Sequence, residues 1–116
     1  MNQLETLIKE LDLDEIARKH AQQITPMLLE LDTDVADIGT IESYLTLYSL
    51  SKRAKAELDN APLAENGKRN PCFDIFINST KELKQISNQL GLNVKSRLTL
   101  KNLSAEKEDE SIDPLL

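Results

Sequence analysis

The stretch that decides the fold spans residues 66–100 and reads NGKRNPCFDIFINSTKELKQISNQLGLNVKSRLTL. It opens with Asn66-Gly67, a dipeptide typical of tight turns. Asn70-Pro71 follows and indicates a helix start, because Asn caps helices well and proline is tolerated at the first helical position. The stretch therefore predicts a turn followed by a helix of about five turns.

A glycine marks the end of this long helix. Gly91 is placed for a left-handed cap, and Leu92 is expected to fold back over the last turn as in a Schellman motif. Asn93 then caps a last short helix, which we predict over residues 94–103.

One apolar seam runs along the long helix, since Phe76, Leu83 and Leu90 are spaced seven residues apart. This spacing offers the seam to a partner helix. The partner is the preceding segment, which Asp34 caps and which reads as one helix of about 40 Å, ending near Asn60. Its apolar stripe is too wide for a simple surface helix, so we expect it to be covered on more than one side.

The first third of the chain reads as short helices. Residues 4–11 follow the i, i+3, i+4, i+7 rule of an amphipathic helix. Asp12 is the expected cap of a second helix, with a glutamate three residues on, and the alternative is one continuous helix through Asp12. Thr25-Pro26 then predicts a restart and a short helix over residues 26–31.

These elements together predict an all-α fold, an antiparallel pair of long helices with short N-terminal helices and a short capped C-terminal helix. No alternating run of β-branched residues is long enough to predict a strand. We divide the chain into three regions. Residues 1–31 form short helices and are a candidate DNA-binding element, and residues 32–103 form a helical hairpin core and oligomerisation region. Residues 104–116 are an acidic tail that we expect to be disordered.

Charge is distributed unevenly along the chain. The 116 residues carry a formal net charge of −6, which argues against nucleic acid as a partner. Residues 104–116 hold five acidic residues and one lysine, a net charge of −4, so the rest of the chain carries only −2. The body of the protein can therefore present a local basic face.

The sequence carries no signal for export, membrane insertion or disulfide formation. Its single cysteine, Cys72, excludes an internal disulfide and fits a reducing compartment. No basic-then-apolar leader is present, and no apolar run approaches the roughly 20 residues needed to span a bilayer. We therefore expect a protein that is neither exported nor embedded in a membrane.

Nothing in the sequence predicts catalysis. A covalent mechanism needs a base within reach of a nucleophile. The only imidazole is His20, which we expect to be exposed, and the only thiol is Cys72, which we expect to be a half-buried core residue. No cluster suits zinc, no loop suits calcium and no glycine-rich loop suits a phosphate, so we expect no catalytic residue, no metal and no cofactor.

Basic residues gather in two places that bear on nucleic acid. Lys52, Arg53 and Lys55 point largely to one side of a predicted helix, and Lys68-Arg69 stands at a turn where it can grip a phosphate. The alternative is that these are solvated faces balanced by nearby acids. A second interpretation is a helix-turn-helix in the first third. Its second helix, residues 13–23, carries side chains of groove-reading types: Arg18, Lys19, His20, Gln22 and Gln23.

Assembly is the third interpretation of the residues. Wide apolar stripes on two long helices, in a small chain poor in aromatic residues, indicate surface left over for subunit contacts. The tail ends in SIDPLL, an acidic segment whose apolar tip is typical of a disordered peptide that docks into a partner's groove. A simple solubilising tail is the alternative.

Residues 24–103 resemble a known family. An Asp at a helix start, Asp34 or Asp37, leads into a long helix that contains Tyr44. Asn70-Pro71, the triplet Leu90-Gly91-Leu92 and Arg97 then follow in order. Their order and spacing resemble the short all-helical family of phage terminase small subunits.

This resemblance implies a non-enzymatic packaging factor in the cytoplasm of a bacterial host. Such a factor forms homo-oligomeric rings, recognises double-stranded viral DNA, and recruits and regulates the ATP-driven large terminase. On this reading the candidates for contacting DNA phosphates are Lys52, Arg53, Lys55, Lys68 and Arg69, and those for the large subunit are Ile112, Leu115 and Leu116. The competing interpretation, favoured by the acidic balance, is a helical protein-interaction adaptor or regulator with no DNA role.

Overall fold

The computed structural model describes residues 2–61 and 64–92 and is all-α, as predicted. Four α-helices dominate the described residues, with one 3-10 turn and one very short hairpin. In chain order the elements are α1 Gln3–Glu10, α2 Glu15–Glu30, η1 Val35–Asp37, α3 Ile38–Asn60, β1 Ala64–Glu65, β2 Lys68–Arg69 and α4 Pro71–Leu90.

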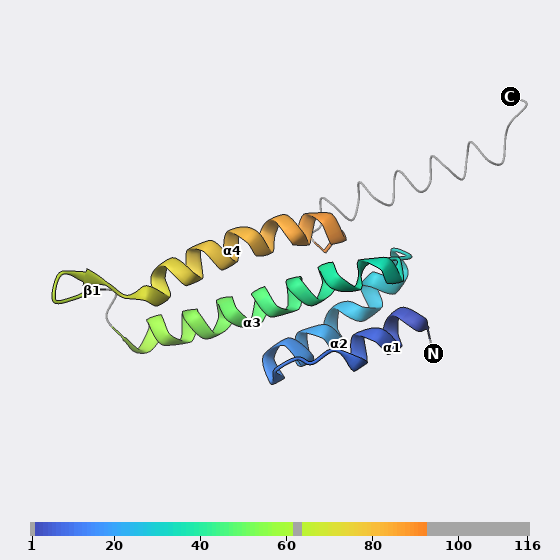
Figure 1. Ribbon diagram of the computed structural model, residues 1–116, viewed down its shortest axis with the longest axis horizontal. Helices are drawn as coiled ribbons and strands as arrows, with labels where there is room; N and C mark the ends of the chain where they lie inside the picture. Colours follow the sequence, from blue (N-terminus) through green and yellow to red (C-terminus); the bar gives the residue numbers. More distant parts are fainter. Residues whose placement is uncertain (1, 62–63, 93–116) are drawn as a thin grey trace, which may run out of the picture.

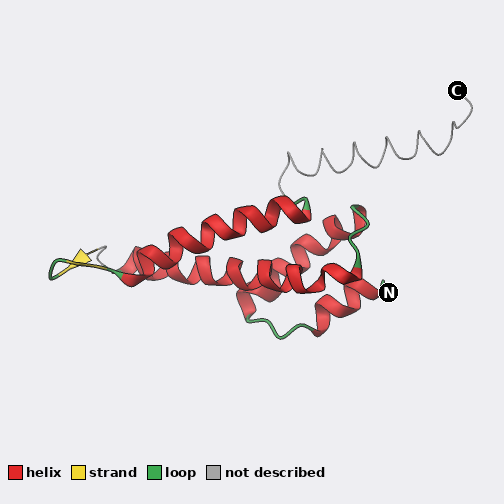
Figure 2. Ribbon diagram, turned by 45° about the horizontal axis from the view of Figure 1, so that its top comes forward, coloured by secondary structure: helices red, strands yellow, loops and turns green. Residues whose placement is uncertain are grey.

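Helices α3 and α4 form the predicted antiparallel pair, and the β-hairpin extends beyond their joined ends (Figure 1). Helices α1 and α2 lie only against the half of α3 that is far from the hairpin, in both views (Figures 1 and 2). The molecule is therefore three layers thick at one end and a bare pair of helices at the other. We call residues 2–49 and 81–92 the proximal half, and residues 50–61 and 64–80 the distal half.

The hydrophobic core lies in the proximal half. Leu28, Ile41 and Leu45 are each 0% exposed there. This core draws on all four helices, and its buried members are Leu4, Ile8, Ala17, Ala21, Ile24, Leu28, Ile41, Tyr44, Leu45 and Leu90. The core thus crosses the boundary that we drew at residue 31, so the N-terminal helices and the hairpin of long helices are packed together.

Both ends of α4 match the sequence prediction. The Asn70 side chain accepts a hydrogen bond from the backbone N–H of Cys72, and Pro71 occupies the first turn. At the other end Gly91 is left-handed, with φ of 73°, and the Leu92 N–H donates to the Ser87 carbonyl at 2.9 Å. This is the predicted Schellman-type ending.

Two predictions about the first third are wrong. The chain is extended between α1 and α2, which excludes the continuous helix, and the cap of α2 is Asp14 rather than Asp12: the Asp14 carboxylate accepts from the Ala17 N–H at 2.8 Å. Helix α2 also continues through Pro26 instead of restarting there. Burial of Ile24 and Leu28 on either side of Pro26 offsets the backbone hydrogen bond that the proline cannot make.

The expectation that no strand forms is also wrong, although only for a minimal hairpin. Ala64 pairs with Arg69 and Glu65 with Lys68, around a turn in which Asn66 and Gly67 have φ of 53° and 75°. Two positive φ values are typical of a type I′ turn, whose twist suits a hairpin. Strands of two residues are too short to show an alternating pattern in a sequence.

The last predicted helix, over residues 94–103, and the acidic tail lie outside the described residues. Among the helices that the structure describes, none combines the length and the apolar character that crossing a membrane requires.

Candidate nucleic-acid interface

The three predicted DNA-contacting residues of α3 are exposed, and each has a partner within the protein. The Lys52 ammonium nitrogen lies 5.4 Å from the centre of the Tyr48 ring. The Arg53 Nε atom lies 3.8 Å from an Asp14 carboxylate oxygen, and the Lys55 Nζ atom lies 3.4 Å from Asp59. Exposed pairs of this kind contribute little energy, so these side chains remain free to turn toward an anion.

The other two predicted residues form strand β2 at the distal tip. Both Lys68 and Arg69 are exposed. Arg69 Nη1 lies 2.9 Å from Asp74 Oδ1, and its guanidinium carbon lies 5.2 Å from the centre of the Phe73 ring. The stack and the ion pair place the Arg69 side chain beside the start of α4.

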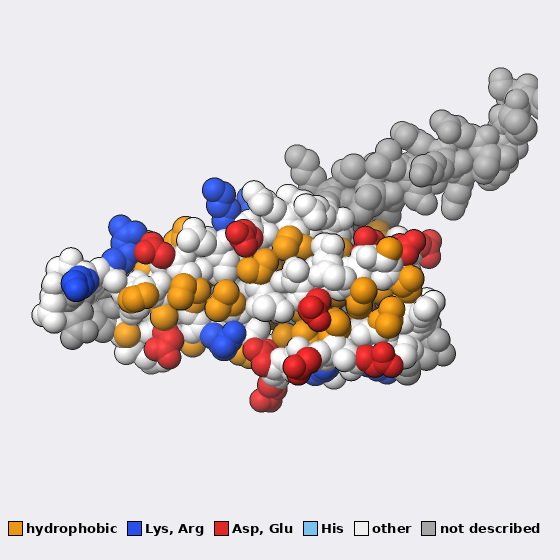
Figure 3. All heavy atoms as spheres, viewed as in Figure 1, with side chains coloured by type: hydrophobic (Ala, Val, Ile, Leu, Met, Phe, Trp, Pro, Cys, Tyr) orange, Lys and Arg blue, Asp and Glu red, His pale blue; other side chains and the backbone are white. Residues whose placement is uncertain are grey.

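The fold therefore brings these five basic residues toward one end of the molecule. The β-hairpin follows directly on the C-terminal end of α3 (Figure 1). The space-filling view shows Lys and Arg side chains around that end, interspersed with acidic ones (Figure 3). The result is a mixed surface rather than a purely basic one.

His20 is not the exposed residue that the sequence predicted. Its ring stacks on Tyr48, with 3.6 Å between ring centres and 3° between planes, and its Nε2 atom lies 2.8 Å from the Tyr44 hydroxyl oxygen. Its Nδ1 atom lies 3.2 Å from Gln23 Oε1. A neutral ring protonated on Nδ1 satisfies both contacts, since it donates to Gln23 and accepts from Tyr44.

Burial sets the titration of this cluster. It lowers the pKa of His20 below its ordinary value of 6.5 and raises the pKa of Tyr44 to about 12. The sequence carried a signal for this arrangement: His20 lies three residues after Ala17 and four before Ile24, which places it on the buried face of α2. Tyr44 and Tyr48, four residues apart, present their rings to that face.

Asp14 joins the start of α2 to the middle of α3. Besides capping α2, its carboxylate accepts a hydrogen bond from the Ser49 hydroxyl and faces Arg53. The Ser49 hydrogen bond is the main reason that the pKa of Asp14 is lowered below 3.8, and the Ala17 N–H adds to it. Arg53 therefore has an internal contact that the sequence did not reveal.

Arg18 is likewise used inside the protein. Its Nη1 atom donates to the carbonyls of Ile8 and Lys9 at 3.2 and 3.1 Å, and its Nη2 atom donates to the Leu11 carbonyl. These carbonyls lie at the end of α1, where helical partners run out. Of the groove-reading residues predicted for a helix-turn-helix, Arg18, His20 and Gln23 have contacts within the protein. Lys19 and Gln22 are exposed.

Large apolar side chains remain uncovered on α2 and α4. Ile75 and Ile77 of α4 are 40% and 49% exposed, and Ile16 of α2 is 37% exposed. Leu47 and Glu82 both border two open hollows of about 390 and 280 Å³ along the α3–α4 seam. Figure 3 shows apolar side chains following that seam.

The imidazole and the thiol of the described residues lie in different halves of the molecule. His20 is surrounded by Tyr44, Tyr48 and Gln23, while Cys72 lies in the first turn of α4 in the distal half. The same part of the chain contains no group of three or more residues able to hold a metal ion. The predicted tail residues Ile112, Leu115 and Leu116 lie outside it.

Comparison with known proteins identifies the family. A family model described as phage terminase, small subunit, matches residues 17–107. This match covers most of the chain, from α2 past the end of α4. No curated protein and no solved structure gave a significant match. The chain belongs to the phage terminase small-subunit family.

Proposed function

We propose that this protein is a non-enzymatic DNA-packaging factor, which recognises double-stranded viral DNA and recruits and regulates the ATP-driven large terminase. The observation that carries the proposal is the family match over residues 17–107. The protein then acts in the cytoplasm of a bacterial host, where a phage or prophage encodes it.

Five basic residues are the proposed DNA contacts, because they are exposed and all belong to the distal half: Lys52, Arg53, Lys55, Lys68 and Arg69. The acidic partners of Arg53, Lys55 and Arg69 form only solvent-exposed pairs, which phosphate groups can replace. Residues 1–31 are a further candidate element for contacting DNA.

Subunit assembly and the large-subunit contact are assigned to other parts of the chain. The uncovered apolar residues of α4 support a homo-oligomer, arranged as a ring, built from residues 32–103. The acidic tail of residues 104–116 is the proposed contact with the large subunit, through Ile112, Leu115 and Leu116.

The competing proposal is a helical interaction protein without a DNA role. The acidic partners beside Arg53, Lys55 and Arg69 favour it, because they lower the positive potential that DNA would meet. A salt titration of DNA binding separates the two functions.

Gel shifts with duplex DNA at low and moderate salt test DNA recognition. The variant Lys52→Gln/Lys55→Gln keeps Arg53 and its contact with Asp14. We expect the slope of log K against log salt to fall by about 1 for each phosphate that the variant no longer neutralises. The matched control is Lys81→Gln/Lys84→Gln, which removes two exposed lysines from α4 in the proximal half. Equal slopes for both variants would show that the DNA contacts lie elsewhere.

The proposed regulation of the large terminase is tested by the ATPase rate of the large terminase encoded beside this chain. We expect the rate to change when the full chain is added, and the change to disappear with Leu115→Asp/Leu116→Asp. An ATPase rate that is indifferent to the wild-type chain would contradict the packaging role.

A further inference from the structure

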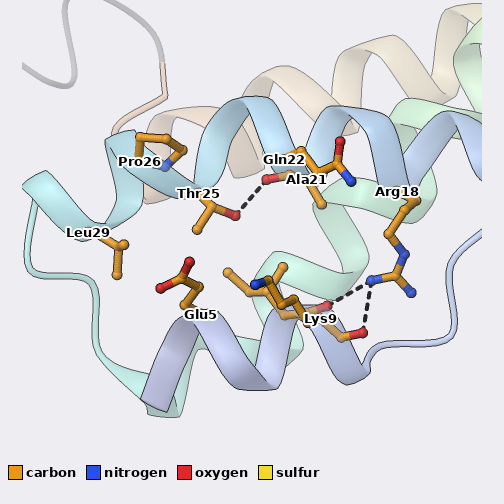
Figure 4. A pocket seen from close by; sticks show the side chains of 9 residues that line it. Glu5, Lys9, Arg18, Ala21, Gln22, Thr25, Pro26 and Leu29 are labelled. Carbon is orange, nitrogen blue, oxygen red and sulfur yellow. Dashed lines mark hydrogen bonds between the residues drawn. The ribbon is translucent and has the colours of Figure 1, made fainter. Parts of the chain in front are cut away.

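Helices α1 and α2 enclose a groove that the proposed function does not use. It has a volume of about 290 Å³ and a mostly apolar lining (Figure 4). Ile8, Ala21 and Leu29 provide apolar surface, and the first two also belong to the hydrophobic core. The groove is therefore an open extension of the core, suited to apolar side chains.

The border of this groove carries a net positive charge. Lys9 and Arg18 line it together with a single acid, Glu5. Arg18 is held in place by its hydrogen bonds to the Ile8 and Lys9 carbonyls, as Figure 4 shows. An apolar floor with a cationic border suits an acidic peptide that carries apolar anchors.

The two hollows along α3 and α4 have the opposite character. Glu82 borders both, joined by Glu42 at one and Asp74 at the other. An acidic peptide would meet like charges there, which disfavours binding. Of these three cavities, the α1–α2 groove alone has a border that matches an acidic ligand.

This chain itself contains such a peptide. Residues 106–116 read EKEDESIDPLL, with five acids, one lysine and apolar residues at positions 112, 115 and 116. The five acids complement Lys9 and Arg18, and the branched aliphatic side chains suit the floor formed by Ile8 and Leu29.

The chain leaves the described region at Leu92, in the proximal half that also holds the groove. Leu92 packs against the same core cluster that includes Ile8 and Ala21. The 24 residues from 93 to 116 span at most about 80 Å when extended and about 36 Å as a helix. The peptide is therefore tethered within reach, and tethering gives even a weak contact an effective concentration in the millimolar range.

We infer that the acidic segment of residues 106–116 docks its apolar residues into the α1–α2 groove of its own chain. Such docking covers the groove and occupies Leu115 and Leu116. It also regulates the large-subunit contact, since the tail cannot fill both sites at once; this last consequence rests on the proposed function.

Thiol protection tests the docking in the full chain. Gln22 lines the groove and is exposed, so Gln22→Cys in a Cys72→Ser background places one reporter thiol there. We expect its alkylation to be at least about threefold slower with the native tail than with Leu115→Asp/Leu116→Asp, because a tethered segment occupies its site most of the time when its effective concentration exceeds the Kd of the contact. Lys19→Cys, on the same helix outside the groove, should react at one rate with either tail.

A second arm tests the charge match. Lys9→Glu should remove most of the protection of the Gln22→Cys thiol. The control Lys19→Glu makes the same change outside the groove and should leave the protection unchanged. Equal alkylation rates with both tails would overturn the inference. So would protection restored to a Leu115→Asp/Leu116→Asp chain by adding intact cysteine-free chains, since that places the tail on another copy. These assays contain neither DNA nor the large subunit, so a failure here is distinct from a failure of the packaging role.

Discussion

The two halves of this molecule differ in what they bury. In the proximal half, large aliphatic side chains such as Leu28, Ile41 and Leu45 are completely enclosed. In the distal half, the buried residues among those described are small: Ser51, Ala54 and Ser79. The large ones there, Ile75 and Ile77 among them, are exposed or only half-buried.

The difference follows from the number of layers. A helix pair has two outer faces, and only a third layer can cover one of them. Helices α1 and α2 supply that layer to the proximal half, whereas small residues in the distal half let α3 and α4 approach closely without it. The Ser51 and Ser79 hydroxyls donate to carbonyls of their own helices at 2.9 and 2.6 Å, so their burial leaves no unpaired donor. Our central claim is that neighbouring molecules complete the distal half.

The largest effect should come from breaking the proximal core. Leu45→Ala removes a fully buried side chain, and we expect it to lower the free energy of unfolding by about 2–5 kcal/mol. The matched change in the distal half is Leu50→Ala, on the same helix but only half-buried, and its cost should be clearly smaller. Urea unfolding of both variants makes the comparison. Equal losses would show that the two halves are packed alike.

A smaller effect is expected at the junction of the halves. Asp14→Ala removes a helix cap and the acceptor for Ser49, and we expect a loss of about 1–3 kcal/mol. Asp14→Asn keeps a capping side chain, so most of the stability should remain.

The pH dependence sharpens this prediction. The pKa of Asp14 is lowered in the folded protein, so its charge stabilises the fold above its ordinary pKa of 3.8. This contribution is lost as the pH falls from 3.8 through the folded pKa. Over that pH range the free energy of unfolding should decrease less for Asp14→Asn than for the wild type. Identical decreases would contradict the role assigned to Asp14.

The smallest effect concerns His20 in the proximal half. Burial lowers its pKa below 6.5, so the folded state favours the neutral ring. The unfolded chain binds the proton first, and stability therefore falls as the pH drops from 6.5 through the folded pKa. The thermal unfolding temperature of the His20→Gln variant should depend less on pH over this range than that of the wild type. A wild type without any slope there would rule out a half-buried, neutral His20.

The ends of α4 were predictable because their signals are local. Asn70-Pro71 and Gly91 act on backbone groups within one turn, and α4 begins and ends at these residues. The prediction at Pro26 failed. Its local signal for a helix start is equally strong, yet α2 continues through Pro26 because Ile24 and Leu28 are buried on either side of it. Tertiary packing determines the course of the helix at this position, and it cannot be read from the sequence.

The candidate site was predictable only as a set of exposed charges. Their exposure was foreseeable from residue type, whereas their partners were not, since Arg53 meets Asp14 from a distant part of the chain. His20 was half-predictable, because its spacing from Ala17 and Ile24 marks the buried face of α2. Its stacking on Tyr48 depends on how α2 crosses α3.

The most direct test of the central claim is the mass of the full chain in solution at micromolar concentration, measured by sedimentation velocity. We predict a closed oligomer that Ile75→Ser/Ile77→Ser dissociates, while Ile16→Ser, which changes an exposed isoleucine of the proximal half, leaves it intact. A wild-type chain that sediments as a monomer, or an equal effect of the two changes, would contradict the account.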